Sequence, residues 1–583
     1  MMAAFHRVTP IVGALNPRSS VSKPAQFGKK GHRFGCECGR CANFADEKLT
    51  GQVVAVWVQF SAMLRRRQQL LPVMAVVVLV SSACTSRDAT STAPRSTTPT
   101  STTTVPTEAT TTKIPETTAA TTSGTAADTV DGTIEPSTTI TTAPAQPGGV
   151  GVGDSLYPLA GNSGYEVDDY DLSIAWDPSQ QHLDGREILS ATATQRLSSF
   201  NLDFVGLEIG AATVNDAVAT AQRFGSKLQI TPSIPIANGE SFTTKIDYSG
   251  TPAIDRNEIS WLDLGDYVVV AGQPGSPNWY PVNLHPSDKA TYTFRLTAPQ
   301  DLTAVANGDL TGQTSKGGLT TSTYRMDQQM ASYLATVIIG PITIVEGRTT
   351  TSGVKVRHVI ENSLVDEGTR LFARTSDMIE VFEKLFGPFP FSVYGGALIP
   401  ADLGFALEDQ TLSIFDGEYA DGEAESVVAH ELAHQWFGDA VSVANWGDIW
   451  LNEGFATYAQ LLWLQSQDPT FNVADWIHQR VYRGSKLEIP PAVPPSQDDL
   501  FGPSVYQRGA LALHALRVEV GDAAFFHILQ EWVRRFSGGN ASTKDFIALS
   551  EEISGKDLGD VFQEWLYDYG LPATLDGVDL SGR

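Results

Sequence analysis

Two histidines and a glutamate in the segment VVAHELAHQWFG, residues 427–438, constrain the fold of this chain more than any other feature. His430 and His434 are four residues apart, so on a helix their side chains project from one face about one turn apart. Two neutral imidazoles placed in this way suit Zn²⁺, and Glu431 between them can reach a water molecule on the metal. The segment therefore predicts a helix that carries part of a zinc site.

A third ligand is expected on the next helix, and the segment WLNEGFATY, residues 450–458, supplies one. Glu453 lies 19 positions after His434. The alternative interpretation, in which the histidines are ordinary core residues, does not predict a glutamate at that place. We therefore expect one Zn²⁺ per chain, held by His430, His434 and Glu453, with one coordination position open for water.

The residue pattern changes from strand-like to helical along the chain, which indicates the fold class α+β. Residues 149–356 alternate β-branched and aromatic residues with polar ones between turn residues, as expected of an all-β N-terminal domain. Residues 357–583 are expected to form a mainly helical domain, with an edge strand at 405–415. Strands are predicted at 170–176, 186–193, 202–209, 227–234, 243–250, 290–298 and 333–340. Helices are predicted at 366–385, 422–437, 452–467, 505–520, 523–536, 543–553 and 558–569.

Residues 63–83 have the order of charged, apolar and small residues that is typical of a secretory signal peptide. Their apolar run, residues 70–80, is too short to span a bilayer comfortably. Cys84 follows directly and resembles the bacterial lipobox, in which the signal is removed and the cysteine is lipidated, although Ser81 departs from the usual aliphatic residue. Ordinary cleavage and an uncleaved anchor are the alternatives.

The regions on either side of this signal are not expected to fold. Because a signal should lie near the start of its protein, we hypothesise that translation begins at Met63, with residues 1–62 untranslated or disordered. Residues 84–148 are rich in Thr, Ser and Pro without apolar periodicity, which predicts a disordered stalk. Such a stalk would hold the folded part away from a membrane.

The net charge of −26 combines two unlike regions, +8 over residues 1–83 and −34 over the remainder. A region with this much negative charge repels the phosphate backbones of nucleic acids, which argues against nucleic-acid binding. No cysteine lies in the last 499 residues, so disulfides cannot hold the folded region together. Packing must hold the folded region together, and a metal bound through histidines and carboxylates can contribute to this.

HELAHQWFG followed by NEGFA, with 18 residues between His434 and Glu453, resembles the aminopeptidase N family of gluzincin zinc metallopeptidases. The resemblance extends over about residues 160–573, and GYEVDDYDLSI (164–174) and WYPVNLHPSDKATYTF (279–294) are similar to the family's β domain. It implies a saddle-like β domain followed by a thermolysin-like catalytic domain, in a short form without the C-terminal helical domain of larger members.

The resemblance also implies roles for further residues. In GFALEDQ (404–410), Glu408 matches the glutamate that holds the free α-amine of the substrate, with Leu407 and Asp409 departing from the family's Met and Asn. Tyr506, in VYQRGALALHALR (505–517), matches the tyrosine that stabilises the oxyanion. Gln273 resembles the residue lining the first substrate pocket. Asp439 and Asn452 flank the motifs and either orient the ligands or cap helices.

These assignments imply a zinc aminopeptidase that removes N-terminal residues from peptides, with Glu431 as general base. A thermolysin-like endopeptidase and an inactive peptide-binding lipoprotein are the alternatives. The expected partners are peptides with a free N-terminus and a membrane reached through lipid on Cys84. The protein is accordingly expected to be a monomer on the outer side of a bacterial membrane.

Overall fold

The computed structural model describes residues 143–253, 261–265, 268–270, 276–401, 403–421, 424–473, 475–476 and 487–580. The predicted signal, the lipidation site at Cys84, nearly all of the stalk and Gln273 lie outside these residues. No helix in the described part of the chain has the length and apolar character needed to cross a membrane.

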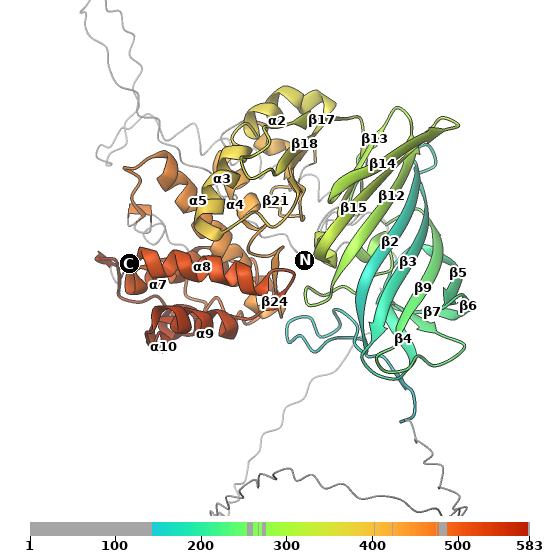
Figure 1. Cartoon of the computed structure of the whole chain (residues 1–583), viewed down its shortest axis with the longest axis horizontal. Coiled ribbons are helices and arrows are strands. Elements are labelled where there is room, and N and C mark those ends of the chain that lie inside the picture. The colour runs from blue at the N-terminus through green and yellow to red at the C-terminus, as the bar shows by residue number, and fades with distance from the viewer. Residues whose placement is uncertain are drawn as a thin grey trace, which may run out of the picture. The chain divides into compact units, whose positions relative to one another are not determined.

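The N-terminal region is a β domain, as the alternating pattern predicts. Within the described residues its main sheet has the strand order β14-β15-β12-β2-β3-β9-β5-β6, and Figure 1 shows its long strands side by side. Two four-stranded sheets accompany it, in the orders β1-β4-β8-β7 and β10-β11-β16-β13. The strands are β1 (Gln146–Pro147), β2 (Tyr165–Asp177), β3 (His182–Ala193), β4 (Leu197–Asp203), β5 (Glu208–Val214), β6 (Ala217–Val218), β7 (Thr220–Phe224), β8 (Lys227–Thr231), β9 (Ser241–Gly250), β10 (Trp261–Asp263), β11 (Val268–Val270), β12 (Lys289–Pro299), β13 (Thr303–Ala306), β14 (Asp309–Lys316), β15 (Leu319–Ala331) and β16 (Val337–Gly340).

The core of the β domain follows from this alternation, because successive residues of a strand face opposite sides of the sheet. On β2, Tyr170, Leu172 and Ile174 are buried, whereas the residues between them are partly exposed. Tyr170 stacks on Tyr292 of the parallel neighbour β12, with ring centroids 4.8 Å apart. One face of the main sheet therefore forms the core of the domain.

The C-terminal region combines a mixed sheet with helices. Within the described residues the sheet has the order β17-β18-β20-β22-β21, and β19 pairs with β18. The strands are β17 (Ile342–Glu346), β18 (Lys355–Glu361), β19 (Val393–Tyr394), β20 (Gly396–Ile399), β21 (Ala406–Leu407), β22 (Ser413–Asp416), β23 (Val441–Val443), β24 (Gly539–Ala541), β25 (Thr574–Leu575) and β26 (Val578–Asp579). The α-helices are α2 (Val365–Leu371), α3 (Thr375–Phe386), α4 (Glu425–Ala433), α5 (Trp450–Gln467), α7 (Gly509–Val520), α8 (Asp522–Phe536), α9 (Thr543–Ser554) and α10 (Gly559–Phe562). Across both regions, the short helices are η1 (Ser276–Asn278), η2 (Ser332–Leu334), η3 (Asn362–Leu364), η4 (Gly417–Asp421), η5 (Trp446–Asp448), η6 (Gln497–Asp499) and two π-helices, η7 (Ser504–Arg508) and η8 (Gln563–Tyr567).

Several predicted boundaries differ from the structure. The helix expected at 366–385 is broken between α2 and α3, where Phe372 stacks on His358 with ring centroids 4.6 Å apart. The strand expected at 405–415 is two short strands, β21 and β22, which pair with each other, and only β21 lies at the edge. The predicted helices at 505–520 and 558–569 each contain a π-helical turn, η7 and η8. The region predicted as one strand at 202–209 contains the end of β4 and the start of β5.

Candidate metal and peptidase centre

Helices α4 and α5 bring the three predicted zinc ligands together. Oε2 of Glu453 lies 3.3 Å from Nε2 of His430 and 3.5 Å from Nε2 of His434. Ligands at about 2.0–2.2 Å from a tetrahedral zinc are about 3.3 Å from one another, so these separations fit the metal. Within the described residues, these three side chains form the one cluster of His, Cys, Asp or Glu with such geometry.

The charge states of His430 and Glu453 also suit a metal. Burial lowers the pKa of His430, which favours the neutral imidazole that binds zinc. Burial alone would raise the pKa of Glu453, but the neighbouring charge of His434 and hydrogen bonds with both histidines outweigh it and lower the pKa to about 2. Glu453 is therefore an ionised ligand at neutral pH.

His434 is oriented by the backbone directly after α4. The helix ends at Ala433, and the chain then turns so that the carbonyl oxygen of Phe437 lies 3.2 Å from Nδ1 of His434. A proton on Nδ1 can be donated to this carbonyl, which leaves the Nε2 lone pair to face Glu453 and the metal position.

Two further carboxylates lie beside the ligands. Glu431, on α4, is buried, and burial raises its pKa well above the ordinary value. Glu408 directly follows β21, and its pKa is raised by burial and by the charge of Glu453, against the opposing effect of His434. The structure thus places Glu408 and Glu431 within electrostatic reach of the same metal ligands.

Gln435 holds the Glu408 segment against α4, and the sequence analysis did not assign it a role. Its Nε2 donates to the carbonyl oxygen of Glu408 at 3.0 Å, and its Oε1 accepts from the backbone N–H of Thr411 at 2.8 Å. The side chain is fully buried. The sequence signal for this role was an amide side chain directly after His434. Its hydrogen-bond partners, however, lie more than 20 residues away in the sequence.

Tyr506 reaches the centre from η7. Its ring lies nearly parallel to that of His430, with centroids 6.0 Å apart and an angle of 11° between planes. Its pKa is raised well above the ordinary value by burial and by the charges of Glu453, Glu408 and Glu431. The phenol therefore stays protonated and can donate a hydrogen bond.

Asp439 and Asn452 are buried beside the centre, but neither caps a helix as one prediction allowed. Asn452 lies in the first turn of α5 and its Nδ2 is 3.5 Å from the hydroxyl of Tyr333, a residue of the β domain. The carboxylate of Asp439 has no hydrogen-bond partner among the described residues. Its backbone carbonyl accepts from Nζ of Lys289 at 2.7 Å, which links the two domains at this point.

Both domains match known family descriptions. Residues 166–334 match the Peptidase M1 N-terminal domain, and residues 404–565 match the Peptidase family M1 domain. Each match includes segments that the sequence analysis had compared with this family.

The chain is similar to curated aminopeptidases over part of their length. It is 28% identical over 319 residues to Aminopeptidase M1-B of Oryza sativa subsp. japonica, covering 51% of this chain and 36% of that protein. It is 26% identical over 401 residues to Aminopeptidase N of Streptomyces lividans, covering 64% of this chain and 46% of that protein. The chain thus spans less than half the length of these relatives.

Solved structures match over their full length. An M1 zinc metallopeptidase mutant from Deinococcus radiodurans, bound to a Tyr-Ser-Ala substrate, is 34% identical with a TM-score of 0.68, covering 72% of this chain and 99% of that one. A two-domain M1 zinc metallopeptidase mutant bound to L-arginine is likewise 34% identical with a TM-score of 0.68, covering 73% and 100%. The β domain and the helical domain of this chain therefore match the fold of two-domain M1 zinc metallopeptidases.

Proposed function

This chain belongs to peptidase family M1, and we propose that it is a zinc aminopeptidase that removes single residues from the N-termini of peptides. One observation carries the proposal: the backbone of Glu408 is held by Gln435, the residue after His434, and its carboxylate interacts electrostatically with Glu453 and Glu431. A carboxylate at that position can bind the ammonium of a free N-terminus, which limits cleavage to the first peptide bond. The substrate complexes named for the structural relatives support this substrate class.

His430, His434 and Glu453 hold the metal, which when bound acts as a Lewis acid that activates water and polarises the scissile carbonyl. Glu408 pairs with the ammonium of the substrate and so sets the position of the bond to be cleaved. Glu431 takes a proton from the attacking water at its carboxylate and passes it to the leaving nitrogen. Burial raises its pKa, which favours uptake of that proton.

Tyr506 acts on the carbonyl oxygen that becomes negative during attack. Its hydroxyl donates a hydrogen bond to that oxygen, and the bond strengthens as charge develops. Because its pKa is raised, the proton stays on the phenol throughout. We also propose Gln273 as a residue of the first substrate pocket, on its resemblance to the family position.

Release of a fluorophore from aminoacyl amides tests the proposal directly. The full chain should cleave the free-amine substrates, lose activity with a chelator and regain it with added Zn²⁺. The N-acetylated substrates should be cleaved at least tenfold more slowly. Equal cleavage of both would indicate an endopeptidase, and no cleavage of either would contradict both enzyme functions.

We further propose that the protein is a lipoprotein, anchored through Cys84 on the outer side of a bacterial membrane, with residues 84–148 as the tether. The arginines, apolar run and small residues before Cys84 support this. Cys84→Ser should move the protein from the membrane fraction to the soluble fraction, and the wild type should incorporate radiolabelled palmitate. Mass spectrometry should find no peptide from residues 1–62 if translation begins at Met63.

A further inference from the structure

Tyr506 lies on one short turn, η7, and two separate sets of contacts hold that turn in place. In one set, η7 and the start of α7 meet α5, the helix that carries Glu453. In the other set, Arg508 reaches the C-terminal segment around η8. The position of the tyrosine relative to the metal ligands depends on both contacts.

The contact with α5 is made by two glycines whose backbones touch. A Cβ added to Gly454 would lie 2.9 Å from both Cα and the carbonyl carbon of Gly509, and one added to Gly509 would lie 3.0 Å from Cα of Gly454. Glycine is a poor helix former, yet Gly454 lies inside the 18-residue helix α5. Close packing of the two backbones explains it, because no other residue permits this approach.

Arg508 makes the other set of contacts through backbone carbonyls alone. The side chain is fully buried. Its Nε donates to Trp565 at 2.8 Å, and Nη2 donates to Glu564 at 3.0 Å and Asp568 at 2.6 Å. Its Nη1 lies 3.2–3.4 Å from the carbonyl oxygens of residues 487, 488 and 489. The planar guanidinium thus joins η7 to two other segments of the chain.

We infer that Gly454, Gly509 and Arg508 are positioning residues that place the hydroxyl of Tyr506 relative to Glu453 and His430. Glu453 directly precedes Gly454, and Tyr506 lies three residues before Gly509, so any separation of the glycines displaces the tyrosine from the ligands. The inference rests on the proposed peptidase function and adds residues that touch neither substrate nor metal.

The size of the displacement follows from the contact distance. A carbon atom at 3.0 Å must move by a few tenths of an ångström to reach ordinary van der Waals contact, and backbone atoms cannot rotate away as a side chain can. Misplacement of a catalytic group by about 1 Å can reduce turnover about 100-fold. A shift of a few tenths should therefore lower kcat about 5- to 30-fold.

The test is a double-mutant cycle in the full chain with an aminoacyl-amide substrate. Gly509→Ala should lower kcat about 5- to 30-fold, leave KM unchanged and retain one zinc per chain. In a Tyr506→Phe background, where no hydroxyl remains to be misplaced, the same substitution should lower kcat less than about twofold. Arg508→Lys, which offers three donors in place of the fork of five, should show the same dependence on Tyr506.

Gly447→Ala is the matched control, because its Cβ would meet only Cδ1 of Leu156, at 4.0 Å. It should keep the wild-type kcat. Gly454→Ala changes the same contact from the side of α5. It replaces Gly509→Ala in the test if the melting temperature shows that Gly509→Ala does not fold. Unchanged kcat in the glycine variants, or equal losses with and without the Tyr506 hydroxyl, would overturn the inference. A wild type that cleaves no aminoacyl amide would instead contradict the proposed function, and the inference would fall with it.

Discussion

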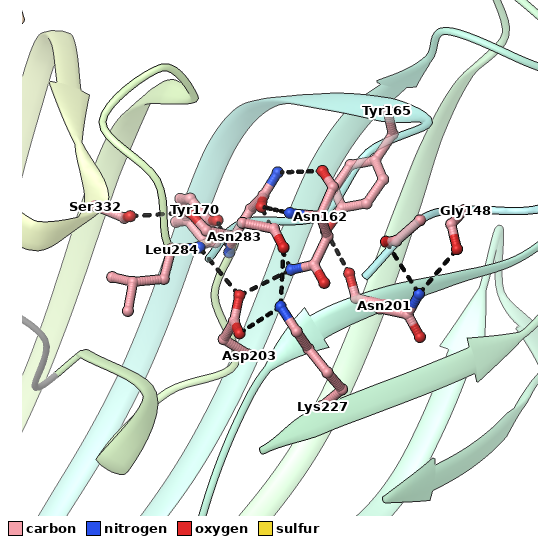
Figure 2. Close-up of polar contacts among 12 residues, drawn as sticks. Gly148, Asn162, Tyr165, Tyr170, Asn201, Asp203, Lys227, Asn283, Leu284 and Ser332 are labelled. Carbon is pink, nitrogen blue, oxygen red and sulfur yellow. Dashed lines mark hydrogen bonds and ion pairs between the residues drawn. The ribbon is translucent and has the colours of Figure 1, made fainter. Parts of the chain in front are cut away.

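Two buried groups of charged residues, one in each domain, are built on different principles. In the β domain, Nζ of Lys227 lies 2.7 Å from Oδ1 of Asp203 and donates to the carbonyl of Gly161 at 2.8 Å (Figure 2). Oδ2 of Asp203 accepts from Nδ2 of Asn162 at 2.8 Å and from the backbone of Leu284. Both charges of this network therefore have partners within the chain.

The catalytic centre instead gathers carboxylates that repel one another. The charges of Glu408 and Glu453 both raise the pKa of Glu431, and Glu408 and Glu431 both raise the pKa of Asp439, in each case added to the effect of burial. The charge of His434 opposes this repulsion, while Lys289 binds backbone carbonyls rather than a carboxylate. Under the proposed function, a zinc ion and the ammonium of a substrate would supply positive charge to this group.

The difference separates a structural charge network from a functional one. Charges that are satisfied inside the chain contribute to stability and to a fixed geometry. Charges left to be satisfied by a ligand cost stability but provide binding and catalysis. Substitutions in the two groups should accordingly have opposite consequences, with loss of stability in the first and loss of activity in the second.

Glu431→Gln should have the largest effect of this kind. It removes the base while keeping the shape and the zinc ligands, so kcat should fall about 10²–10⁴-fold. Zinc content should stay at one per chain, and the melting temperature should not fall, because one of several mutually repelling carboxylates is removed. Near-normal turnover, measured with an aminoacyl amide, would refute the role of Glu431 as base.

Lys227→Met should instead lower the stability of the fold and leave turnover unchanged. It leaves Asp203 buried without its cation, at a cost of about 3–5 kcal/mol in the free energy of unfolding. Burial already raises the pKa of Asp203 despite the nearby lysine, so the unpaired carboxyl should take up a proton. Turnover per folded molecule should remain unchanged.

An exposed pair provides the control for the lysine. Nζ of Lys245 is bonded to Asp216 at 2.5 Å, with both side chains largely exposed. Lys245→Met should cost less than about 1 kcal/mol. Urea unfolding measures both variants, and similar losses at the two sites would contradict the importance of burial in this comparison.

Glu408→Ala should weaken mainly the binding of substrates that have a free amine, whereas Glu431→Gln should lower turnover. Loss of a charged hydrogen bond to the substrate ammonium should cost about 2–3 kcal/mol, or about 30- to 150-fold in kcat/KM, mainly through KM. The N-acetylated substrate lacks the ammonium and should be affected far less. If both substrates lose activity equally, Glu408 does not bind the amine.

Glu187 is an exception in the β domain, because its charge is not balanced within the chain. Its substitution should change the melting temperature, and this effect should be the smallest of those predicted. It lies on β3 between Leu172 and Ile246, fully buried, and neither carboxyl oxygen has a hydrogen-bond partner among the described residues. Burial raises its pKa well above the ordinary 4.5. Burial without an ion-pair partner thus favours the protonated form of this carboxyl in the fold.

The pH dependence of stability tests this assignment. Because the folded state binds the proton more tightly, the contribution of Glu187 is complete below about pH 4.5 and is lost as the pH rises towards its folded-state pKa. Glu187→Gln, neutral at every pH, should be more stable than the wild type at pH 8 by about 2–4 °C in melting temperature, and less so at pH 5. Glu208→Gln, at an exposed position on β5, is the control for the substitution itself and should leave the melting temperature nearly unchanged. A constant difference across this range would show that Glu187 is not protonated in the fold.

The zinc ligands could be predicted because their geometry is local. His430 and His434 are one helical turn apart, and Glu453 opens the following helix, so helix geometry and a short connection bring them together. The β domain was predictable for the same reason, since burial on β2 and β3 follows the period of two. Glu408 and Tyr506 were assigned by family resemblance, not by spacing.

Contacts between distant segments could not be predicted in this way. Gln435 binds backbone 24–27 residues away, and Lys289 binds Asp439 across 150 residues. No periodicity relates such positions. The break between α2 and α3 falls at Phe372, which stacks on His358, and the helical periodicity through Phe372 does not indicate this contact.

The sequence by itself determined the class of chemistry, since two imidazoles at helical spacing and a carboxylate on the following helix suffice to indicate zinc. It also determined the division into a β domain and a helical domain, because side-chain alternation is set by backbone geometry. Only the tertiary structure decided how the accessory groups reach the metal: through the touching glycines of α5 and α7, the carbonyls around Arg508, and the amide of Gln435. Those positions depend on the close packing of elements that are remote in sequence, where a few tenths of an ångström decide which atoms meet.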